Sequence, residues 1–113
     1  MTPVYIQRIN DFVEGDENLL KEILKGIDDA LDEIDQFSSI EYNQINIEAF
    51  RTIHHKYKPT FDIFGLTELK TVFEENKSIL DNPPIDYNLF NQNLKNCREI
   101  ISKIKTTIQK EFQ

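Results

Sequence analysis

Apolar residues that recur every three or four positions constrain the fold of this chain more than any other feature. From Leu19 to Phe37 they occupy one face of an expected helix, and Asp16 precedes them as an expected N-cap. Three later stretches show the same spacing, and strand-like alternation is absent. With only 3 glycines and 4 prolines in 113 residues, few positions interrupt a helix. The sequence therefore predicts an all-α protein.

Capping and turn residues divide the chain into one short helix and four long ones. The short helix is expected from Pro3 to Phe12, after Thr2 as its N-cap. The inner faces of the long helices run over 19–37, 46–64, 69–80 and 90–108. Gly65 is expected to close the second of these, while Thr67 and Asp86 are expected to cap the third and fourth. Short connections favour an antiparallel up-down-up-down four-helix bundle, with the short helix covering one end and residues 1–113 forming one domain.

The charge balance limits the classes of partner. Thirteen basic residues against twenty acidic ones give a net charge of −7, which argues against nucleic acid or an anionic membrane surface as the main partner. Cys97 is the single cysteine, which precludes an internal disulfide and favours a reducing, cytoplasmic setting. No apolar run approaches the length of a transmembrane helix, and the first residues lack the pattern of a signal peptide. We expect a cytoplasmic monomer that binds neither nucleic acid nor membranes.

No metal or cofactor site of the chain's own is expected. His54 and His55 are adjacent and diverge by about 100° on a helix, whereas metal-binding pairs use a spacing of three or four residues. The acidic residues of the first long helix are expected to form a solvated face: Asp28, Asp29, Asp32, Glu33 and Asp35.

A proline interrupts the helical pattern of the stretch that contains both histidines. Pro59 removes an N–H and clashes with the carbonyl four residues earlier, at a cost of about 3 kcal/mol in a regular helix. A break at Pro59 is one outcome. We favour a kink within one helix, because Phe61 and Phe64 continue the apolar phase that begins at Phe50.

Helical phase separates the two histidines. At about 100° per residue, His55 points about 160° from the core direction, while His54 lies about 60° from it, at the flank of the buried face. Arg51, Lys58 and Asp62 share the outward stripe of His55. This helix is therefore expected to present all four of these polar residues to solvent.

An exposed imidazole beside a lysine suits one kind of chemistry better than others. A convex helix surface supplies neither the cleft nor the orienting carboxylate that a general base needs. A free imidazole titrates near pH 6.5, so a nitrogen lone pair is available at neutral pH to attack a phosphoryl group. Lys58, one turn from His55, is placed to balance the added charge, while Mg²⁺ and the leaving group would come from a partner.

Two segments around Pro59, with an earlier one, carry a family signature. They are His55-Lys56-Tyr57-Lys58-Pro59-Thr60-Phe61, Phe64-Gly65-Leu66-Thr67-Glu68-Leu69 and Gly15-Asp16-Glu17-Asn18-Leu19-Leu20. The first two resemble the signature of histidine-containing phosphotransfer (HPt) domains: an acceptor histidine, lysine three residues later, a small residue or proline next, and a downstream glycine that closes the helix. The third is similar to the family's entry into its first long helix. The resemblance covers about Tyr5 to Phe112.

The resemblance implies a phosphorelay module of bacterial two-component signalling. Such a module takes a phosphoryl group from an aspartate of one receiver domain and passes it to another. His55 would be the phosphoacceptor and Lys58 the residue that balances the charge of phosphohistidine, with Arg51, Pro59 and Asp62 as candidate partner contacts. The partners would be receiver domains of a hybrid sensor histidine kinase or a response regulator, and Mg²⁺ would belong to the receiver.

Pro59 departs from the commonest form of the signature, which has glycine at that position. The Lys-Pro version resembles a bacterial subgroup, so the departure concerns local helix geometry and not the chemistry. The chain has no kinase or ATP site of its own, and we expect a phosphocarrier instead of an enzyme.

Two other function classes remain open. One is a helical docking or scaffold module that has the fold but does not transfer phosphate; the other is an enzyme with a histidine base. The pairing of His55 with Lys58 favours the relay, and nothing in the sequence supplies the rest of an enzymatic site.

Overall fold

The computed structural model describes residues 2–113, which fold into five α-helices and no strands. The all-α class predicted from the spacing of apolar residues is confirmed. The helices are α1 (Val4–Val13), α2 (Glu17–Ser38), α3 (Ala49–Phe64), α4 (Thr67–Asp81) and α5 (Tyr87–Glu111).

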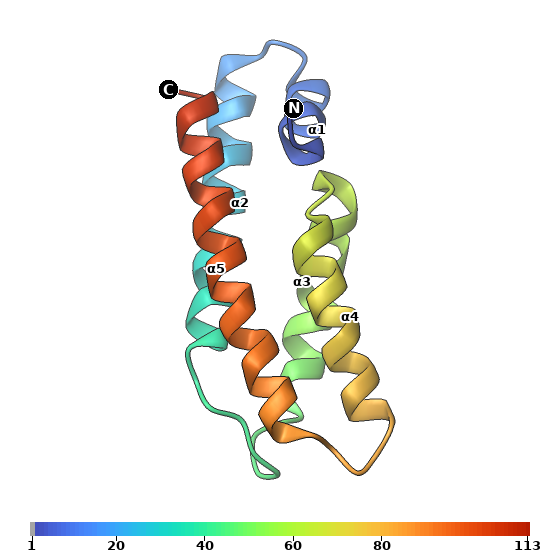
Figure 1. Cartoon of the computed structure of the whole chain (residues 1–113). Coiled ribbons are helices and arrows are strands. Elements are labelled where there is room, and N and C mark those ends of the chain that lie inside the picture. Colours follow the sequence, from blue (N-terminus) through green and yellow to red (C-terminus); the bar gives the residue numbers. More distant parts are fainter. Residues whose placement is uncertain (1) are drawn as a thin grey trace.

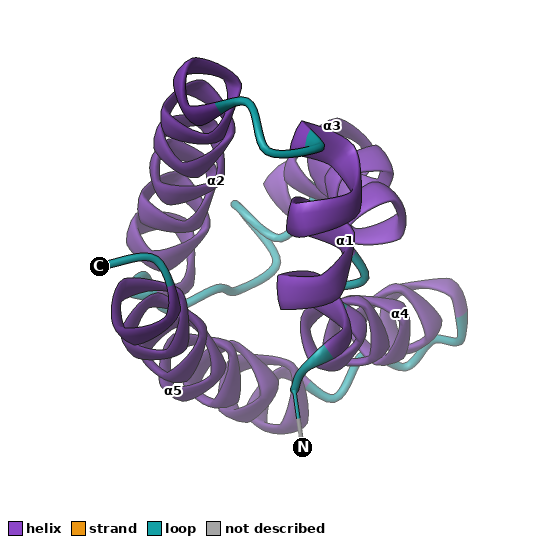
Figure 2. Cartoon of the chain, turned by 90° about the horizontal axis from the view of Figure 1, so that it is seen from above, coloured by secondary structure: helices purple, strands orange, loops and turns teal. Residues whose placement is uncertain are grey.

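The long helices stand around a shared apolar interior (Figures 1 and 2). α2 packs against α5, α5 against α4, and α4 against α3. α1 contacts α2 and α3 and lies near the end of the molecule at which both chain termini are found (Figure 1). The α2–α3 and α4–α5 connections lie together at the opposite end.

Aromatic side chains fill the centre where α3, α4 and α5 meet. The ring centroid of Phe50 lies 5.1 Å from that of Phe73 and 5.2 Å from that of Phe90, and all three side chains are fully buried. Phe61 packs edge-on against Phe73 at 5.2 Å. This cluster fixes which face of α3 is inward, and therefore which face carries polar residues outward.

Two of the expected N-caps are confirmed. Asp16 and Asp86 each accept a hydrogen bond of 3.0 Å through Oδ1, from the backbone N–H of Leu19 and Leu89 respectively. Each carboxylate thereby satisfies an N–H that has no partner within the helix.

Two other expected N-caps are wrong. The N-cap position of α1 is occupied by Pro3 and not Thr2, and the N-cap of α4 is Leu66, with Thr67 as the first helical residue. Neither cap position makes a side-chain capping bond. The chain reverses sharply at Gly65, so helical geometry resumes immediately after Leu66 and leaves Thr67 inside α4.

The start of α3 is also later than the pattern suggests. Asn46, four residues before Phe50, was expected on the inner face of the helix but lies in a turn, and α3 begins at Ala49. The Asn46 side chain instead holds the loop: its Oδ1 accepts from Asn43 N at 2.7 Å, and its Nδ2 donates to Glu41 O at 3.2 Å. Asparagine competes for backbone groups in this way and favours turns over helix interiors.

α3 continues through Pro59 without a break. The prediction of one helix is therefore confirmed. It ends at Gly65, whose φ of 66° lies in the left-handed region and whose N–H donates to Phe61 O, as expected of a C-cap glycine.

A buried pair of amides joins α4 to α5. Asn93 Nδ2 donates to Asn76 Oδ1 at 2.8 Å, and Asn76 Nδ2 donates to Phe90 O at 3.3 Å. Both asparagines are buried among apolar side chains. These bonds compensate for removing the amide groups from water.

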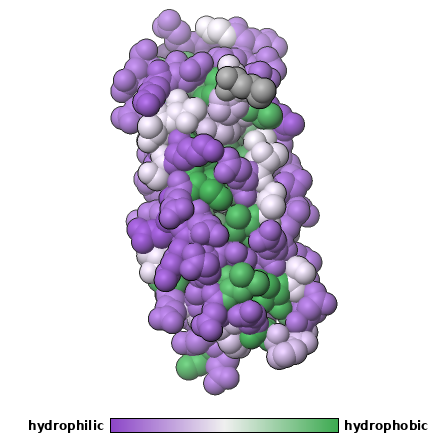
Figure 3. Space-filling view, viewed as in Figure 1, coloured by the Kyte–Doolittle hydropathy of each residue, from purple (hydrophilic) through white to green (hydrophobic). Residues whose placement is uncertain are grey.

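Polar side chains cover most of the face drawn in Figure 3, and apolar ones show only in a seam between them. Within residues 2–113, no helix combines the length and apolarity that crossing a membrane requires.

Candidate functional site: the exposed histidine and its basic groove

The two histidines occupy different environments on α3, as helical phase predicts. His55 is exposed, whereas His54 is only 8% exposed. The His54 ring packs against Phe50 and Phe73, with ring centroids 5.5 Å and 5.6 Å away. Only His55 is therefore presented to a macromolecular partner.

A groove of about 390 Å³ lies beside His55, between α3 and α4. Its lining residues are Phe50, Arg51, His54, His55, Lys58 and Lys77. Five of these come from α3, and Lys77 is contributed by α4. The lining contains three permanent cations and no carboxylate, in a chain whose net charge is −7. The groove is thus a local basic site on an acidic protein.

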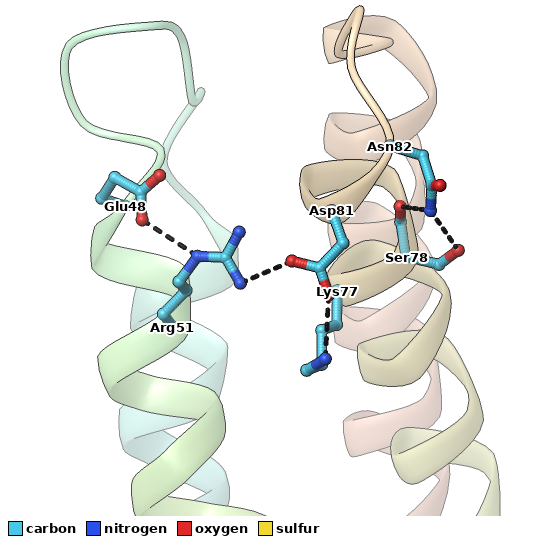
Figure 4. A network of polar contacts seen from close by, with 6 residues as sticks. All are labelled: Glu48, Arg51, Lys77, Ser78, Asp81 and Asn82. Carbon is cyan, nitrogen blue, oxygen red and sulfur yellow. Dashed lines mark hydrogen bonds and ion pairs between the residues drawn. The ribbon is translucent and has the colours of Figure 1, made fainter.

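The other members of the predicted outward stripe are exposed, as expected, but Arg51 is not free. Arg51 Nε lies 3.0 Å from Glu48 Oε2, and Arg51 Nη1 lies 2.8 Å from Asp81 Oδ1 (Figure 4). The second oxygen of Asp81 pairs with Lys77 at 2.8 Å. Lys77 and Arg51 hold the pKa of the Asp81 carboxyl below its ordinary value, mainly through their hydrogen bonds.

Asp62 likewise serves the structure. Its Oδ1 lies 2.7 Å from Lys70 Nζ on α4, which lowers the pKa of the Asp62 carboxyl, and its backbone carbonyl accepts from Arg8 of α1. Asp62 therefore links the C-terminal end of α3 to two other helices. A partner contact by Asp62 or Arg51 would have to compete with these bonds.

Lys58 differs from its neighbours. Among residues 2–113, no carboxylate lies within ion-pairing distance of its ammonium group, although its charge acts on both Asp62 and His54. It lines the groove together with His55. An unpaired cation one turn from an exposed imidazole is free to meet an incoming anion.

Burial disfavours the charged form of His54. The pKa of His54 is lowered, first by desolvation and then by the positive charge of Lys58, with a smaller effect from Lys77 and an opposing one from Glu74. His54 therefore forms a neutral wall of the groove and is poorly placed to act as a nucleophile.

Pro59 is exposed beside these residues. Because its nitrogen carries no hydrogen, it cannot donate to the carbonyl of His55, four residues earlier. The carbonyl of His55 thus lacks the N–H donor that a regular helix would supply.

Asp28, Asp29 and Asp32 of α2 are exposed as expected, whereas Glu33 and Asp35 are partly buried. Carboxylate oxygens of Asp28, Asp29 and Asp32 lie within 4.8 Å of one another. Lys105 of α5 pairs with Asp32 and lies 3.7 Å from Asp28, and Lys25 lies 3.2 Å from Asp29. These contacts are those of a solvated, charge-balanced face.

Cys97 is fully buried, and desolvation raises the pKa of its thiol to about 12. It packs in the core as a small apolar residue, in line with its position on the inner face of α5.

The sequence pattern did not identify Lys77 as part of the site. Lys77 lies 22 positions after His55, on a different helix. Its proximity depends on how α3 and α4 align, which apolar periodicity alone does not specify.

Comparison of the chain with protein-family models, with curated proteins and with solved structures finds no match.

Proposed function

We propose that this chain is a phosphorelay intermediate that accepts a phosphoryl group on His55 and passes it on. The observation that carries the proposal is the exposure of His55 on α3 beside Lys58, with both residues lining one basic groove. The adjacent His54 is buried, which leaves a single histidine accessible for phosphorylation.

The transfer step balances without a cofactor of the chain's own. A lone pair of a neutral His55 ring nitrogen attacks the phosphorus of a receiver's aspartyl phosphate. The N–P bond forms as the acyl P–O bond breaks, and the electron pair returns to the aspartate as a carboxylate. The other ring nitrogen keeps its proton. Passing the group to a second receiver reverses these steps, with Mg²⁺ supplied by the receiver.

The charges around His55 favour its phosphorylated state. A phosphoryl group brings two negative charges to α3. Lys58 lines the groove with His55, and among residues 2–113 no carboxylate lies within ion-pairing distance of its ammonium group. Its interaction favours the phosphorylated state without requiring an existing ion pair to break.

The proposal includes the arrangement and the partners that the HPt resemblance implies. The four long helices would form an antiparallel up-down-up-down bundle, and the protein would act as a cytoplasmic monomer. Receiver domains of a hybrid sensor histidine kinase or of a response regulator would dock over His55, with Arg51, Pro59 and Asp62 at the edge of the contact. The chain would be a phosphocarrier and not an enzyme.

The test follows a phosphoryl label from a receiver to this chain. Receiver domains from the same genome are phosphorylated with labelled acetyl phosphate, separated from the donor and mixed with the purified protein. We expect acid-labile, base-stable label on the chain, lost in His55→Gln and retained in Lys25→Gln, a surface variant outside the groove. Retention in His55→Gln would refute the site. Receivers that bind the chain but keep their label would favour the docking module over the relay.

A further inference from the structure

Two ion pairs align α3 with α4 across the groove. Arg51 of α3 pairs with Asp81 of α4 at 2.8 Å, and Asp62 of α3 pairs with Lys70 of α4 at 2.7 Å. Residue numbers rise along α3 as they fall along α4, so the two helices run in opposite directions past each other. The pairs mark two points of one seam.

The same alignment brings His55 opposite Lys77. His55 lies four residues after Arg51, and Lys77 lies four residues before Asp81. Relative to the other ion pair, His55 lies seven residues before Asp62, and Lys77 lies seven residues after Lys70. Steps of four and seven keep a residue on the same helical face. Two independent contacts therefore predict the same neighbour, and Lys77 does line the groove with His55.

From this alignment, and building on the proposed function, we propose that Lys77 is the second cation for the phosphoryl group on His55. Lys58 would approach the phosphate along α3 and Lys77 from α4 across the groove, so the group would be held between two helices. This assigns to α4 a role in binding the phosphoryl group that His55 and Lys58 alone do not provide.

Asp81 explains how Lys77 can serve both states. In the unphosphorylated protein, Lys77 Nζ lies 2.8 Å from Asp81 Oδ2, while Arg51 holds the other oxygen of the same carboxylate (Figure 4). When Lys77 turns to the phosphate, Arg51 remains as the partner of Asp81, and no carboxylate is left unpaired. The Lys77 side chain is 55% exposed, so it has room to change its rotamer.

The charged groups that face the phosphoryl position come from both helices. α3 contributes Arg51 and Lys58, and α4 contributes Lys77. Glu48 and Asp81 pair with Arg51, and Asp81 also pairs with Lys77, while the negative charge of Glu74 raises the pKa of His54 and opposes the lysines. Glu74 does not line the groove. Among residues 2–113, Lys58 has no carboxylate within ion-pairing distance, so its charge is available to attract a phosphate beside His55.

The test measures the pKa of the phosphoryl group on His55 by phosphorus NMR. The full-length protein is phosphorylated with potassium phosphoramidate, a small donor that needs no receiver, and the His55 resonance is identified by its absence in His55→Gln. A nearby cation stabilises the dianionic phosphate and lowers its pKa. We expect Lys77→Gln and Lys58→Gln each to raise that pKa by about half a pH unit, the size expected for one exposed charge pair.

Lys25→Gln is the matched control. Lys25 pairs with Asp29 four residues later on α2, the same spacing as Lys77 and Asp81, but away from the groove. It should leave the phosphoryl pKa at the wild-type value. Asp81→Asn, which frees Lys77 from its carboxylate, should lower the phosphoryl pKa.

The outcomes separate this inference from the proposed function. A phosphoryl pKa that is the same in Lys77→Gln and Lys25→Gln would overturn the role of Lys77, even if receivers transfer phosphate to His55. A wild-type chain that takes up no phosphoryl group on His55 from phosphoramidate would overturn it as well. If the Lys77 effect is present but no receiver transfers its label, the groove binds the phosphoryl group as inferred and the relay proposal fails.

Discussion

Adjacent residues of one type can have opposite chemical roles when a helix turns them by 100°. His55 faces solvent, whereas His54 packs between Phe50 and Phe73 with a lowered pKa. Their difference could be predicted from the phase of Phe50, Ile53 and Tyr57, because these apolar residues fix the inward direction of α3. The extent to which His54 is buried could not be predicted, because it depends on packing against Phe73 of α4.

The lowered pKa of His54 predicts a pH dependence of stability. Below its ordinary pKa of about 6.5, the unfolded chain binds a proton at this position that the folded protein still excludes. The contribution of His54 is therefore fully present above pH 6.5 and is lost as the pH falls through the lower folded value. We expect the free energy of unfolding in urea to be smaller at pH 5.5 than at pH 7.0.

Variants assign this effect to one histidine. His54→Phe should reduce the loss of stability between pH 7.0 and 5.5. The carboxylates with lowered pKa values, including Asp62 and Asp81, titrate below this range and should not interfere. An undiminished loss in His54→Phe would refute the assignment.

At the scale of the helices, Pro59 lowers the stability of α3, because its nitrogen cannot donate a hydrogen bond to the carbonyl of His55. Replacing it with alanine would restore an N–H that can donate to His55 O and would remove the clash of the ring with that carbonyl. The gain is reduced by about 0.4–1 kcal/mol, because alanine gives the unfolded chain more freedom. We expect Pro59→Ala to raise the free energy of unfolding by about 2 kcal/mol, measured by urea denaturation.

Pro3→Ala provides the control for this prediction. Pro3 occupies the N-cap of α1, where no intrahelical bond is lost, so alanine should bring no comparable gain. A destabilised Pro59→Ala would show that the surroundings of α3 have adapted to the proline.

Gly65 and Gly26 predict opposite effects of the same substitution. A Cβ at position 65 would lie 2.7 Å from Val4 Cγ1 on α1. The backbone φ of Gly65, 66°, is also unfavourable for alanine. Gly26 lies inside α2, and beyond its sequence neighbours and the adjacent backbone of α2 no atom lies within 4 Å of the Cβ position. We expect Gly65→Ala to destabilise the protein by about 1–3 kcal/mol and Gly26→Ala to stabilise it by up to about 1 kcal/mol, both measured by thermal unfolding.

A loss of stability in both variants would contradict the open environment of Gly26. An unchanged stability in Gly65→Ala would mean that α1 can move aside. Sequence alone predicted Gly65 as a helix end, but not its contact with α1. That contact requires the packing of α1 against the corner between α3 and α4, where Arg8 also donates to the carbonyl of Asp62.

For the whole molecule, periodicity predicted the helical class, the main helix boundaries and the exposed face of α3. The boundaries that failed involve polar residues whose bonding is local: Asn46 holds a turn, and Thr67 lies too close to Gly65 to cap α4. Lys77 could not be placed because the alignment of α3 with α4 is a tertiary property. The sequence did contain a signal for this alignment. A single antiparallel alignment of α3 with α4 places Arg51 opposite Asp81 and Asp62 opposite Lys70, so that both oppositely charged pairs form.

The distribution of charge is likewise a property of the assembled fold. Cations from other helices pair with the acidic residues of α2: Lys56 with Glu33 at 3.0 Å, Arg98 with Asp35 at 3.1 Å, and Lys105 with Asp32. Arg51, Lys58 and Lys77 gather instead at the groove. Three basic side chains thus line one groove although acidic residues outnumber basic ones by twenty to thirteen.

The amide pair buried between α4 and α5 has a consequence for this surface. If α4 slid by one turn along α5, Asn76 and Asn93 would lose each other, and each unpaired amide would cost about 1–3 kcal/mol in the core. Alternative packings of α4 are thereby penalised. Lys77 directly follows Asn76. The buried Asn76–Asn93 hydrogen bond, which favours one position of α4, therefore also determines where the ammonium group of Lys77 lies on the surface. Substituting Asn76, which does not line the groove, would then misplace Lys77, which does.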